Sequence, residues 1–357
     1  MSDWLEGIEA LKAVKKNQQN SEPVTDLKFC RVAFDRLLFD DMHFIECQFD
    51  AVTFHESVLE SITFIDCKFN KVSFDSAQLL NCSFVQCSLT DCTAVVLFSE
   101  ELSMVDCQLT RFDATRATLK MARFVKVTCV DVVFLYANLE MSATVQTTHQ
   151  HTNFSRANLQ KAAFQGIDLT TCSLTDIQAT KVVFSECELD GLDLTGAVLT
   201  NMQCNKASLQ GVIFNTCELT GANFTDAKMN GAQMRRSNLT LASWLRTELR
   251  DCCLDQASLV QARVIRSDAC GSSLLNVDAK QSVWHLSNLS DAKMSGANLH
   301  QADLIGADLT RADLTQATLS FAKLDKSIQE DTRFSIGAKA TIMPANDSYA
   351  EFILAAS

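Results

Sequence analysis

Hydrophobic residues recur at every fifth position of this chain from Phe29 to Leu324, and the phase does not slip over sixty successive positions. Of these central positions, 57 are apolar and 43 are Phe or Leu. A period of five fits neither an α-helix, with its period of about 3.6, nor a half-buried strand, which alternates with a period of two. The pattern predicts a backbone that turns a corner once per repeat and keeps one large side chain of each repeat inside.

A second, small residue lies two places before each central residue, as in Ala292-Lys-Met294 and Ala307-Asp-Leu309. These tandem copies of Ala-(Asp/Asn)-Leu-x-x resemble the pentapeptide repeat family, and the resemblance covers about five-sixths of the chain. It implies an all-β fold, a right-handed quadrilateral β-solenoid with four repeats per coil. The central and small residues would point inward, and the other three residues of each repeat would face water. Sixty repeats then give about fifteen coils.

The sequence itself supports a coil of twenty residues. If residues twenty positions apart stack, each column of the coil should be chemically alike, and Cys47, Cys67, Cys87 and Cys107 form one such column. Aromatic residues gather in a second column and leucines in a third: Phe44, Phe64, Phe84, Phe124, Phe164, Phe184, Phe224, Trp244 and Trp284; Leu59, Leu79, Leu119, Leu139, Leu159, Leu199, Leu219, Leu239 and Leu259. The residues therefore indicate separate faces without reference to any family.

The repeats are expected to form one domain. Both prolines, Pro23 and Pro344, lie outside them, where no ladder hydrogen bond is lost. Because stacked coils need no single globular core, we expect a solenoid over residues 25–327, between a helical cap at 1–24 and a cap with a short helix at 328–357. Nine of the eleven glycines fall two places after a central residue, which predicts the corner at that position.

A short helix is predicted at each end of the chain. Residues 3–17 form an amphipathic pattern, and this helix is expected to cover the first coil with one apolar face: Trp4, Ile8, Leu11 and Val14. A capping box at Ser348-Tyr-Ala-Glu351 predicts the start of the second helix. That helix is expected to cover the last coil or to form the seam of a homodimer, since proteins of the resembled family associate through C-terminal elements; its apolar residues are Phe352, Ile353 and Leu354.

Two stretches break the inward rule. Residues 95–112 lie among weak central residues, namely Ala94, Ser99, Met104 and Ala114. Within residues 141–153 the inward positions are polar: Ser142, Thr144, Thr147, His149 and Thr152. Unpaired polar groups in a narrow core would cost several kcal/mol. We therefore predict that residues 141–153 leave the coil as a loop and that residues 95–112 are a second irregularity.

Cysteine usage indicates packing and a reducing compartment. The odd total of fifteen and the acidic N-terminus, which lacks the basic region of a secretory signal, favour a cytoplasmic bacterial protein; export by a route without a signal peptide stays open. No apolar stretch approaches the length of a membrane span. Ten cysteines occupy the small inward slot: Cys47, Cys67, Cys82, Cys87, Cys92, Cys107, Cys172, Cys187, Cys217 and Cys252.

Catalytic chemistry is not indicated. His149 and His151 are the only candidates for a metal or acid–base pair, and no carboxylate or third ligand lies within five residues of them. No set of nucleophile, base and orienting residue, no phosphate-binding loop and no zinc-ligand spacing occurs in the sequence. We expect no enzymatic activity, no cofactor, no metal and no catalytic residues.

Charge is the most readable property of the predicted surface. The net charge is −12, yet residues 1–100 carry 16 acids against 8 bases, whereas residues 201–300 carry 8 acids against 10 bases. Acids at outward positions of the first coils form a candidate interaction surface, in which Asp40 should stack on Glu60 and Glu46 on Asp66: Asp35, Asp40, Asp41, Glu46, Asp50, Glu56, Glu60, Asp66 and Asp75. Arginines form a candidate docking surface for an acidic protein: Arg235, Arg236, Arg246, Arg250, Arg263 and Arg266.

The resemblance implies two non-enzymatic functions. Several family members mimic duplex DNA on type II topoisomerases such as gyrase. Residues 26–100 carry 12 acids and 5 bases, a net charge of about one per 2.6 Å over four coils, against about one per 1.7 Å in DNA. The greater length and the excess of bases over residues 201–300 depart from the gyrase-directed members. We therefore favour a rigid scaffold or adaptor for protein partners without direct nucleic-acid binding, as long members also resemble proteins encoded beside bacterial secretion systems.

Overall fold

The structure is a computed structural model that describes residues 4–20, 22–337, 342–343 and 346–356. The chain divides into two compact units, which meet in sequence between residues 178 and 179. Each unit is a parallel β-solenoid, and together they contain about sixteen turns. The twenty-residue turn predicted from the sequence is confirmed by the pairing of residues twenty positions apart, such as Phe44 with Phe64.

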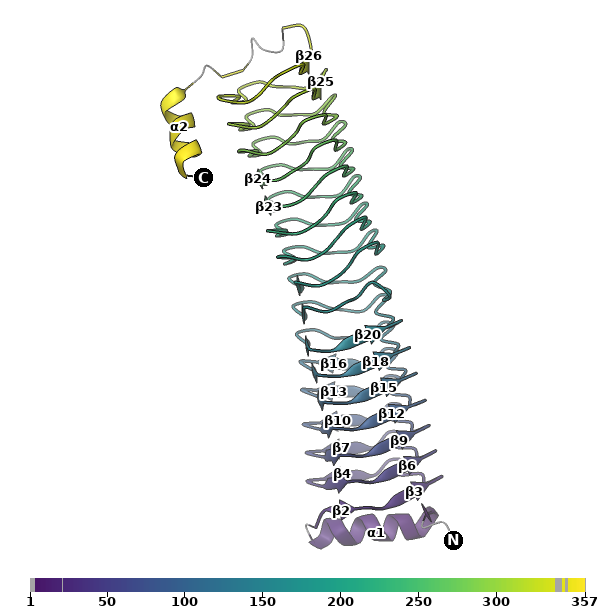
Figure 1. Cartoon of the computed structure of the whole chain (residues 1–357). Coiled ribbons are helices and arrows are strands. Elements are labelled where there is room, and N and C mark those ends of the chain that lie inside the picture. Colours follow the sequence, from purple (N-terminus) through teal and green to yellow (C-terminus); the bar gives the residue numbers. More distant parts are fainter. Residues whose placement is uncertain (1–3, 21, 338–341, 344–345, 357) are drawn as a thin grey trace. The chain divides into compact units, whose positions relative to one another are not determined.

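Unit 1 begins with a short strand and one helix and continues as a stack of three-residue strands (Figure 1). The helix is α1 (Gly7–Asn20). The strands are β1 (Trp4–Leu5), β2 (Val24–Thr25), β3 (Lys28–Cys30), β4 (Leu38–Asp40), β5 (His43–Ile45), β6 (Gln48–Asp50), β7 (Val58–Glu60), β8 (Thr63–Ile65), β9 (Lys68–Asn70), β10 (Gln78–Leu80), β11 (Ser83–Val85), β12 (Ser88–Thr90), β13 (Phe98–Glu100), β14 (Ser103–Val105), β15 (Gln108–Thr110), β16 (Thr118–Lys120), β17 (Arg123–Val125), β18 (Thr128–Val130), β19 (Ala143–Val145), β20 (Thr148–Gln150) and β21 (Ala163–Gln165).

Each turn of unit 1 has four faces. One face is the sheet β1-β3-β6-β9-β12-β15-β18-β20, and a second is the sheet β16-β13-β10-β7-β4. A third runs through β2, β5, β8, β11, β14, β17, β19 and β21. The fourth face is held by single bridges, such as Thr53 with Ser73. All strand pairs are parallel and in register, so a column of side chains runs along every face.

Unit 2 has the same turn but fewer regular strands. Single bridges twenty residues apart, such as Asp268 with Asn288, connect most of its turns. Its strands and helix are β22 (Val183–Ser185), β23 (Ser243–Leu245), β24 (Arg263–Ile265), β25 (Asp313–Leu314), β26 (Arg333–Phe334) and α2 (Asp347–Ala356). The pairing of β25 with β26 extends the repeats beyond the predicted boundary at residue 327.

The corners of both units lie two places after each central residue, as predicted. The backbone there has positive φ whether or not the residue is glycine, as at Glu46 (φ 55°) and Gln301 (φ 56°). Such a conformation is uncommon for residues with a Cβ. It persists because hydrogen bonds to the neighbouring turns hold both sides of the corner, for example from Glu46 N to Ile65 O (2.9 Å) and from Gln48 N to Leu27 O (2.9 Å).

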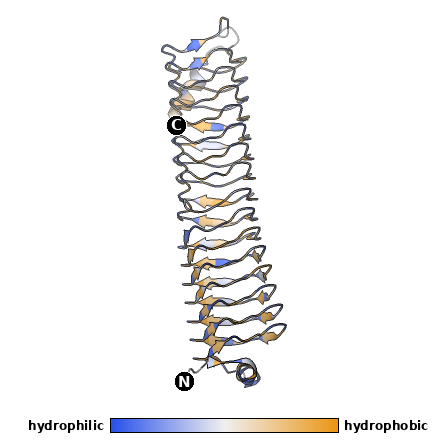
Figure 2. Cartoon of the chain, turned by 90° about the vertical axis from the view of Figure 1, so that its right-hand side faces the viewer, coloured by the Kyte–Doolittle hydropathy of each residue, from blue (hydrophilic) through white to orange (hydrophobic). Residues whose placement is uncertain are grey.

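The interior of unit 1 is a stack of rings and aliphatic chains. Phe64 lies between Phe44 and Phe84, with ring centroids 5.1 and 4.8 Å away. Figure 2 shows the apolar residues of the strands in orange along these turns. Parallel in-register stacking of identical residues buries each ring against the next, and such aromatic pairs contribute about 0.5–1.5 kcal/mol beyond their burial. The aromatic column predicted from the sequence is confirmed here.

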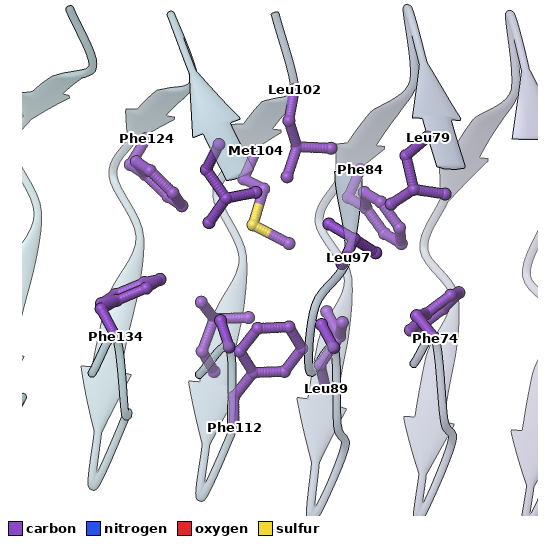
Figure 3. A pocket seen from close by; sticks show the side chains of 14 residues that line it. Phe74, Leu79, Phe84, Leu89, Leu97, Leu102, Met104, Phe112, Phe124 and Phe134 are labelled. Carbon is purple, nitrogen blue, oxygen red and sulfur yellow. The ribbon is translucent and has the colours of Figure 1, made fainter. Parts of the chain in front are cut away.

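The predicted irregularity at residues 95–112 was wrong, because β13, β14 and β15 continue the sheets in register. The reason is that a large side chain at one inward position compensates for a small side chain at a neighbouring inward position. We call this an exchange of volumes between the two slots. Where the central residue is only Ala94 or Ala114, the adjoining small slot holds Leu97 or Phe112, and both large side chains are buried. These chains point into the space beside Met104 (Figure 3), where a cavity of about 20 Å³ remains.

The predicted loop at residues 141–153 was also wrong. Strand β19 pairs with β17, and β20 pairs with β18. The polar side chains stay inside because most of them find partners: Thr147 Oγ1 donates to Phe124 O (3.1 Å), and Thr144 Oγ1 donates to Ala163 O (3.2 Å). Backbone carbonyls within the stack therefore satisfy hydroxyl groups that the sequence suggested would be unpaired.

Helix α1 lies across the first turn of unit 1 (Figure 1), and it buries Ala10 and Val14. The prediction of its extent was partly wrong. The helix begins at Gly7, after Trp4 and Leu5 have formed a strand beside β3. Ile8, which was expected on the apolar face, is 70% exposed. The early strand shifts the start of the helix along the chain, and of the expected apolar face only Val14 is fully buried.

Helix α2 packs against unit 2 beside Gly306, Lys323 and Asp325, and the prediction that it covers the last coil stays a prediction. Asn346 N donates to Asp325 Oδ1 (2.7 Å), and Lys323 Nζ lies 4.4 Å from the centre of the Tyr349 ring. A Cβ added to Gly306 would come within 3.0 Å of Leu354 Cδ2. The absence of a side chain at Gly306 therefore lets the helix approach the turns closely.

All fifteen cysteines are free thiols, and the ten assigned to the inward slot are buried as predicted. Burial raises the pKa of Cys82 to about 11 and of Cys92 to about 12. Only Cys30 and Cys270 are partly exposed. The thiolate is the reactive form of cysteine, so the buried thiols should be inert in the folded protein.

We expect an aromatic disulfide reagent at pH 8 to modify at most two thiols per chain rapidly, and all fifteen after denaturation. Absorbance of the released thiol measures both numbers. A variant with Cys30→Ser and Cys270→Ser should lose the rapid phase. Rapid modification of many thiols in the native protein would contradict the packing described above.

Candidate functional site: the outward columns of unit 1

The outward side chains of unit 1 form straight columns, because each turn repeats the previous one in register. On the sheet β16-β13-β10-β7-β4, the first and third residues of each strand point outward and the middle residue is buried. The third-residue column contains Asp40 directly beside Glu60, as predicted from the twenty-residue coil. Two carboxylates are thereby held about one strand spacing apart, roughly 4.8 Å.

The structure brings together only part of the predicted acidic surface. Asp40 and Glu60 lie on one sheet, with Asp41 at the adjoining corner. Glu46 and Asp66 follow one another along a different corner. The others occupy other faces and corners of the same turns: Asp35, Asp50, Glu56 and Asp75. The acids therefore surround the coil and do not form one patch.

The acids also differ in their partners. Glu56 pairs with Arg36 (Oε2 to Nε 2.8 Å), and this hydrogen bond lowers the pKa of Glu56. Asp35 Oδ1 accepts a hydrogen bond from His55 N (2.9 Å), and Asp75 Oδ1 accepts one from Val95 N (2.8 Å). These three carboxylates are engaged by the solenoid itself.

Five carboxylates of the predicted acidic surface face water without a neutralising partner among the residues that the structure describes. They lie at or next to corners, where side chains project farthest from the stack, and all five are exposed: Asp40, Asp41, Glu46, Glu60 and Asp66. Surface ion pairs contribute little to stability. Unpaired surface carboxylates are therefore free to attract cations or a basic partner.

An exposed apolar column beside these acids was missed in the sequence. The first residues of strands β4, β7 and β13 are Leu38, Val58 and Phe98, and Leu38 and Phe98 are 62% and 40% exposed. Val96 at the adjoining corner is 52% exposed. The signal was present, since these are apolar residues at positions that the repeat turns outward.

The histidine pair is separated by the strand alternation. His149 points inward from β20 and is 7% exposed, whereas the side chain of His151 at the next corner is 72% exposed and lies 3.3 Å from Asp131 Oδ1. The two candidate imidazoles therefore point to opposite sides of the chain and do not form a joint metal or acid–base pair. His149 Nδ1 lies 3.2 Å from Thr152 Oγ1, and burial lowers the pKa of His149 to about 4. Within the described part of the chain, no group of metal-ligating side chains is assembled.

The predicted basic surface is divided among different corners of unit 2. Arg246 and Arg266 share one corner column, but Arg236 lies at another. Arg246 is bound by Asp226 through two hydrogen bonds of 2.7 and 2.8 Å, and Arg250 is bound by Asp268. The remaining residues complete the set on other faces: Arg235 and Arg263. Two of the six arginines are neutralised and the set is spread over several faces, so the arginines do not make a single docking patch.

The C-terminal candidates lie on α2. Phe352 is 66% exposed, and Leu354 faces Gly306 with 37% of its surface exposed. Ile353 is half-buried. The homodimer seam predicted for these residues stays a prediction.

None of the helices that the structure describes is long and apolar enough to cross a membrane. The family model for pentapeptide repeats matches the chain in eight copies, over residues 146–176, 180–215, 203–240, 217–256 and 285–328. No curated protein matches the chain.

Similar solved structures include HetL, a pentapeptide repeat protein involved in heterocyst differentiation regulation from the cyanobacterium Nostoc sp. It is 28% identical, with 52% of this chain and 87% of HetL covered and a TM-score of 0.47. A trypsin-treated form of QnrB1, a plasmid-mediated fluoroquinolone resistance protein, is 14% identical over 66% of this chain and 96% of that one, with a TM-score of 0.22. Rfr23, from the cyanobacterium Cyanothece 51142, is 20% identical over 37% of this chain and 87% of its own, with a TM-score of 0.15.

Proposed function

Since this chain is a pentapeptide repeat protein, we propose that it acts as a non-enzymatic scaffold that binds protein partners through the outward columns of unit 1. The observation that carries the proposal is the set of five exposed carboxylates without neutralising partners, held at fixed spacing by in-register turns. A rigid, preorganised surface loses little entropy on binding. Unpaired charge at fixed positions also accelerates encounter with an oppositely charged partner.

The second candidate function is DNA mimicry on gyrase. The stacked carboxylates of Asp40 with Glu60, and the corner carboxylates of Glu46 and Asp66, favour it. Exposed apolar side chains on the same sheet, above all Phe98, favour the scaffold, because a surface that imitates phosphates has no use for them. An adaptor for a bacterial secretion system would be a special case of the scaffold. Identification of the bound partner as a secretion-system protein would support it.

One variant separates these functions: Asp40→Asn, Glu46→Gln, Glu60→Gln and Asp66→Asn together. For a scaffold, we expect a protein that copurifies with the wild type from the producing cells to be lost with the variant, while gyrase supercoiling is unaffected by micromolar wild-type protein. If the wild type inhibits or protects gyrase and the variant does not, DNA mimicry replaces the scaffold. If the variant retains every partner, the acidic columns are not the binding surface.

A further inference from the structure

Three strands of the sheet β16-β13-β10-β7-β4 of unit 1, namely β4, β7 and β13, begin with an apolar residue and end with a carboxylate, whereas β10 carries Gln78 and Leu80 at these positions. The five strands of the sheet lie one above another in Figure 1. One edge presents the apolar column of Leu38, Val58 and Phe98, reinforced by Val96 at the corner. We call these four residues the apolar column.

A parallel column of carboxylates follows the apolar column. The third residues of β4, β7 and β13 are Asp40, Glu60 and Glu100, and all three are exposed. We call these three residues the acidic column. Residues two apart in a strand lie about 7 Å apart, so the two columns run side by side along the stack, with successive coils about 4.8 Å apart. Strand β10 interrupts both columns between β7 and β13, because it carries Gln78 and Leu80 there.

A surface of this kind has a specific complement. Burial of exposed apolar side chains by a partner is favourable. The carboxylates, in contrast, must stay hydrated or form ion pairs with cationic groups of the partner. Nucleic acid would be repelled by the acidic column. A second copy of the same face would bring carboxylates against carboxylates. The complement is therefore a protein segment with apolar residues along one line and Lys or Arg along the next.

The repeat distance selects the form of that segment. An α-helix rises about 5.4 Å per turn and presents residues i, i+3, i+4 and i+7 along one line. Aligned with the stack, it would place about one turn over each coil, since the coils are spaced by about 4.8 Å. From Leu38 to Phe98 there are three coil spacings. About three helical turns therefore cover the two columns.

We propose that this sheet face docks a basic amphipathic helix of a protein partner, with the apolar stripe of the helix on the apolar column and its basic residues on the acidic column. The inference rests on the proposed scaffold function and specifies the partner's chemistry.

The test uses the full chain and a labelled synthetic helix of four turns, with Leu at i, i+3, i+4 and i+7 spacing and Lys beside them, against a scrambled peptide of the same composition. Fluorescence anisotropy gives the dissociation constants. We expect the helix to bind at least tenfold more tightly than the scrambled peptide. Leu38→Ser with Phe98→Ser should weaken binding at least tenfold at low and high salt. Asp40→Asn, Glu60→Gln and Glu100→Gln together should weaken it at least tenfold at low salt only.

A matched control removes the same charge elsewhere. Asp106→Asn, Glu188→Gln and Asp251→Asn neutralise three exposed carboxylates outside both the acidic column and the five carboxylates of the scaffold proposal, and we expect less than a twofold effect. Equal loss in this control and in the acidic-column variant would reduce the binding to net charge and overturn the proposal, as would equal binding of the scrambled peptide or no binding. The scaffold proposal fails separately, if the copurifying partner is indifferent to the acidic columns.

Discussion

Replacement of Phe112 by Ala should destabilise unit 1 by about 3 kcal/mol or more, although Phe112 stands in an inward position that holds a small residue in most repeats. The ring is buried and supplies the volume that the central residue, Ala114, lacks. Removing it would enlarge the small cavity between Leu109 and Leu119. Urea denaturation followed by circular dichroism would measure the loss of free energy of unfolding.

The exchange of volumes can be tested by reversing it. Phe112→Ala combined with Ala114→Phe moves the ring to the central slot that phenylalanine fills in other turns, and we expect it to recover at least half of the loss. Phe98→Ala, at an outward position 40% exposed in the same region, is the matched control and should cost less than about 1 kcal/mol. If the double variant is no more stable than Phe112→Ala, a ring at position 114 cannot replace the ring at position 112. The two inward positions would then not fill the same space.

The solenoid could be predicted from the sequence because the five-residue period of inward side chains determines the path of the backbone. A side chain that returns to the interior every fifth residue requires a corner in each repeat, and the identical residues of the column beginning at Cys47 fixed the turn at twenty residues. The irregularities were predicted wrongly because each slot was judged alone. Ala114 is a weak centre by itself, but Phe112 fills the same layer, and only the packed structure shows that the two slots share one volume.

Hydrogen bonding explains the second error. Thr147 was interpreted as an unpaired polar group, yet its hydroxyl reaches Phe124 O, a carbonyl that lies 23 residues earlier in the chain and one turn away in space. Cysteine uses the same acceptor position elsewhere, as Cys67 Sγ does with Phe44 O (3.3 Å). The small inward position therefore suits short side chains that donate a hydrogen bond to a carbonyl of the neighbouring turn. The sequence of a single repeat does not show this acceptor.

The candidate site was predicted in part for the same geometric reason. Asp40 and Glu60 are twenty residues apart, and their stacking followed from the coil. Arg236 and Arg246 are ten residues apart, which places them at different corners, so closeness in sequence did not make a patch. Charge alone does not reveal the apolar column, whose signal in the sequence is an apolar residue at an outward position, as at Leu38 and Phe98.

Acidification from pH 7 to pH 4 should cost unit 1 about 3 kcal/mol through His149 alone. Its pKa is about 4 in the folded protein because burial disfavours the charged imidazolium, against about 6.5 in the unfolded chain. Between these values the unfolded state binds a proton that the folded state does not. Stability from this group is therefore complete above about pH 6.5 and is lost as the pH falls towards 4.

The difference between wild type and His149→Leu isolates this effect from the titration of surface carboxylates. Leucine already fills the same inward column at Leu109 and Leu169, so the variant should fold and should be at least as stable as wild type at pH 7. Urea denaturation at half-unit steps from pH 7 to pH 4 should show its advantage growing steadily below pH 6.5. His151→Gln, at an exposed corner, should keep the wild-type pH dependence. An equal slope in wild type and His149→Leu would mean that His149 is protonated in the folded protein without cost, and that the polar layer around it accommodates a charge.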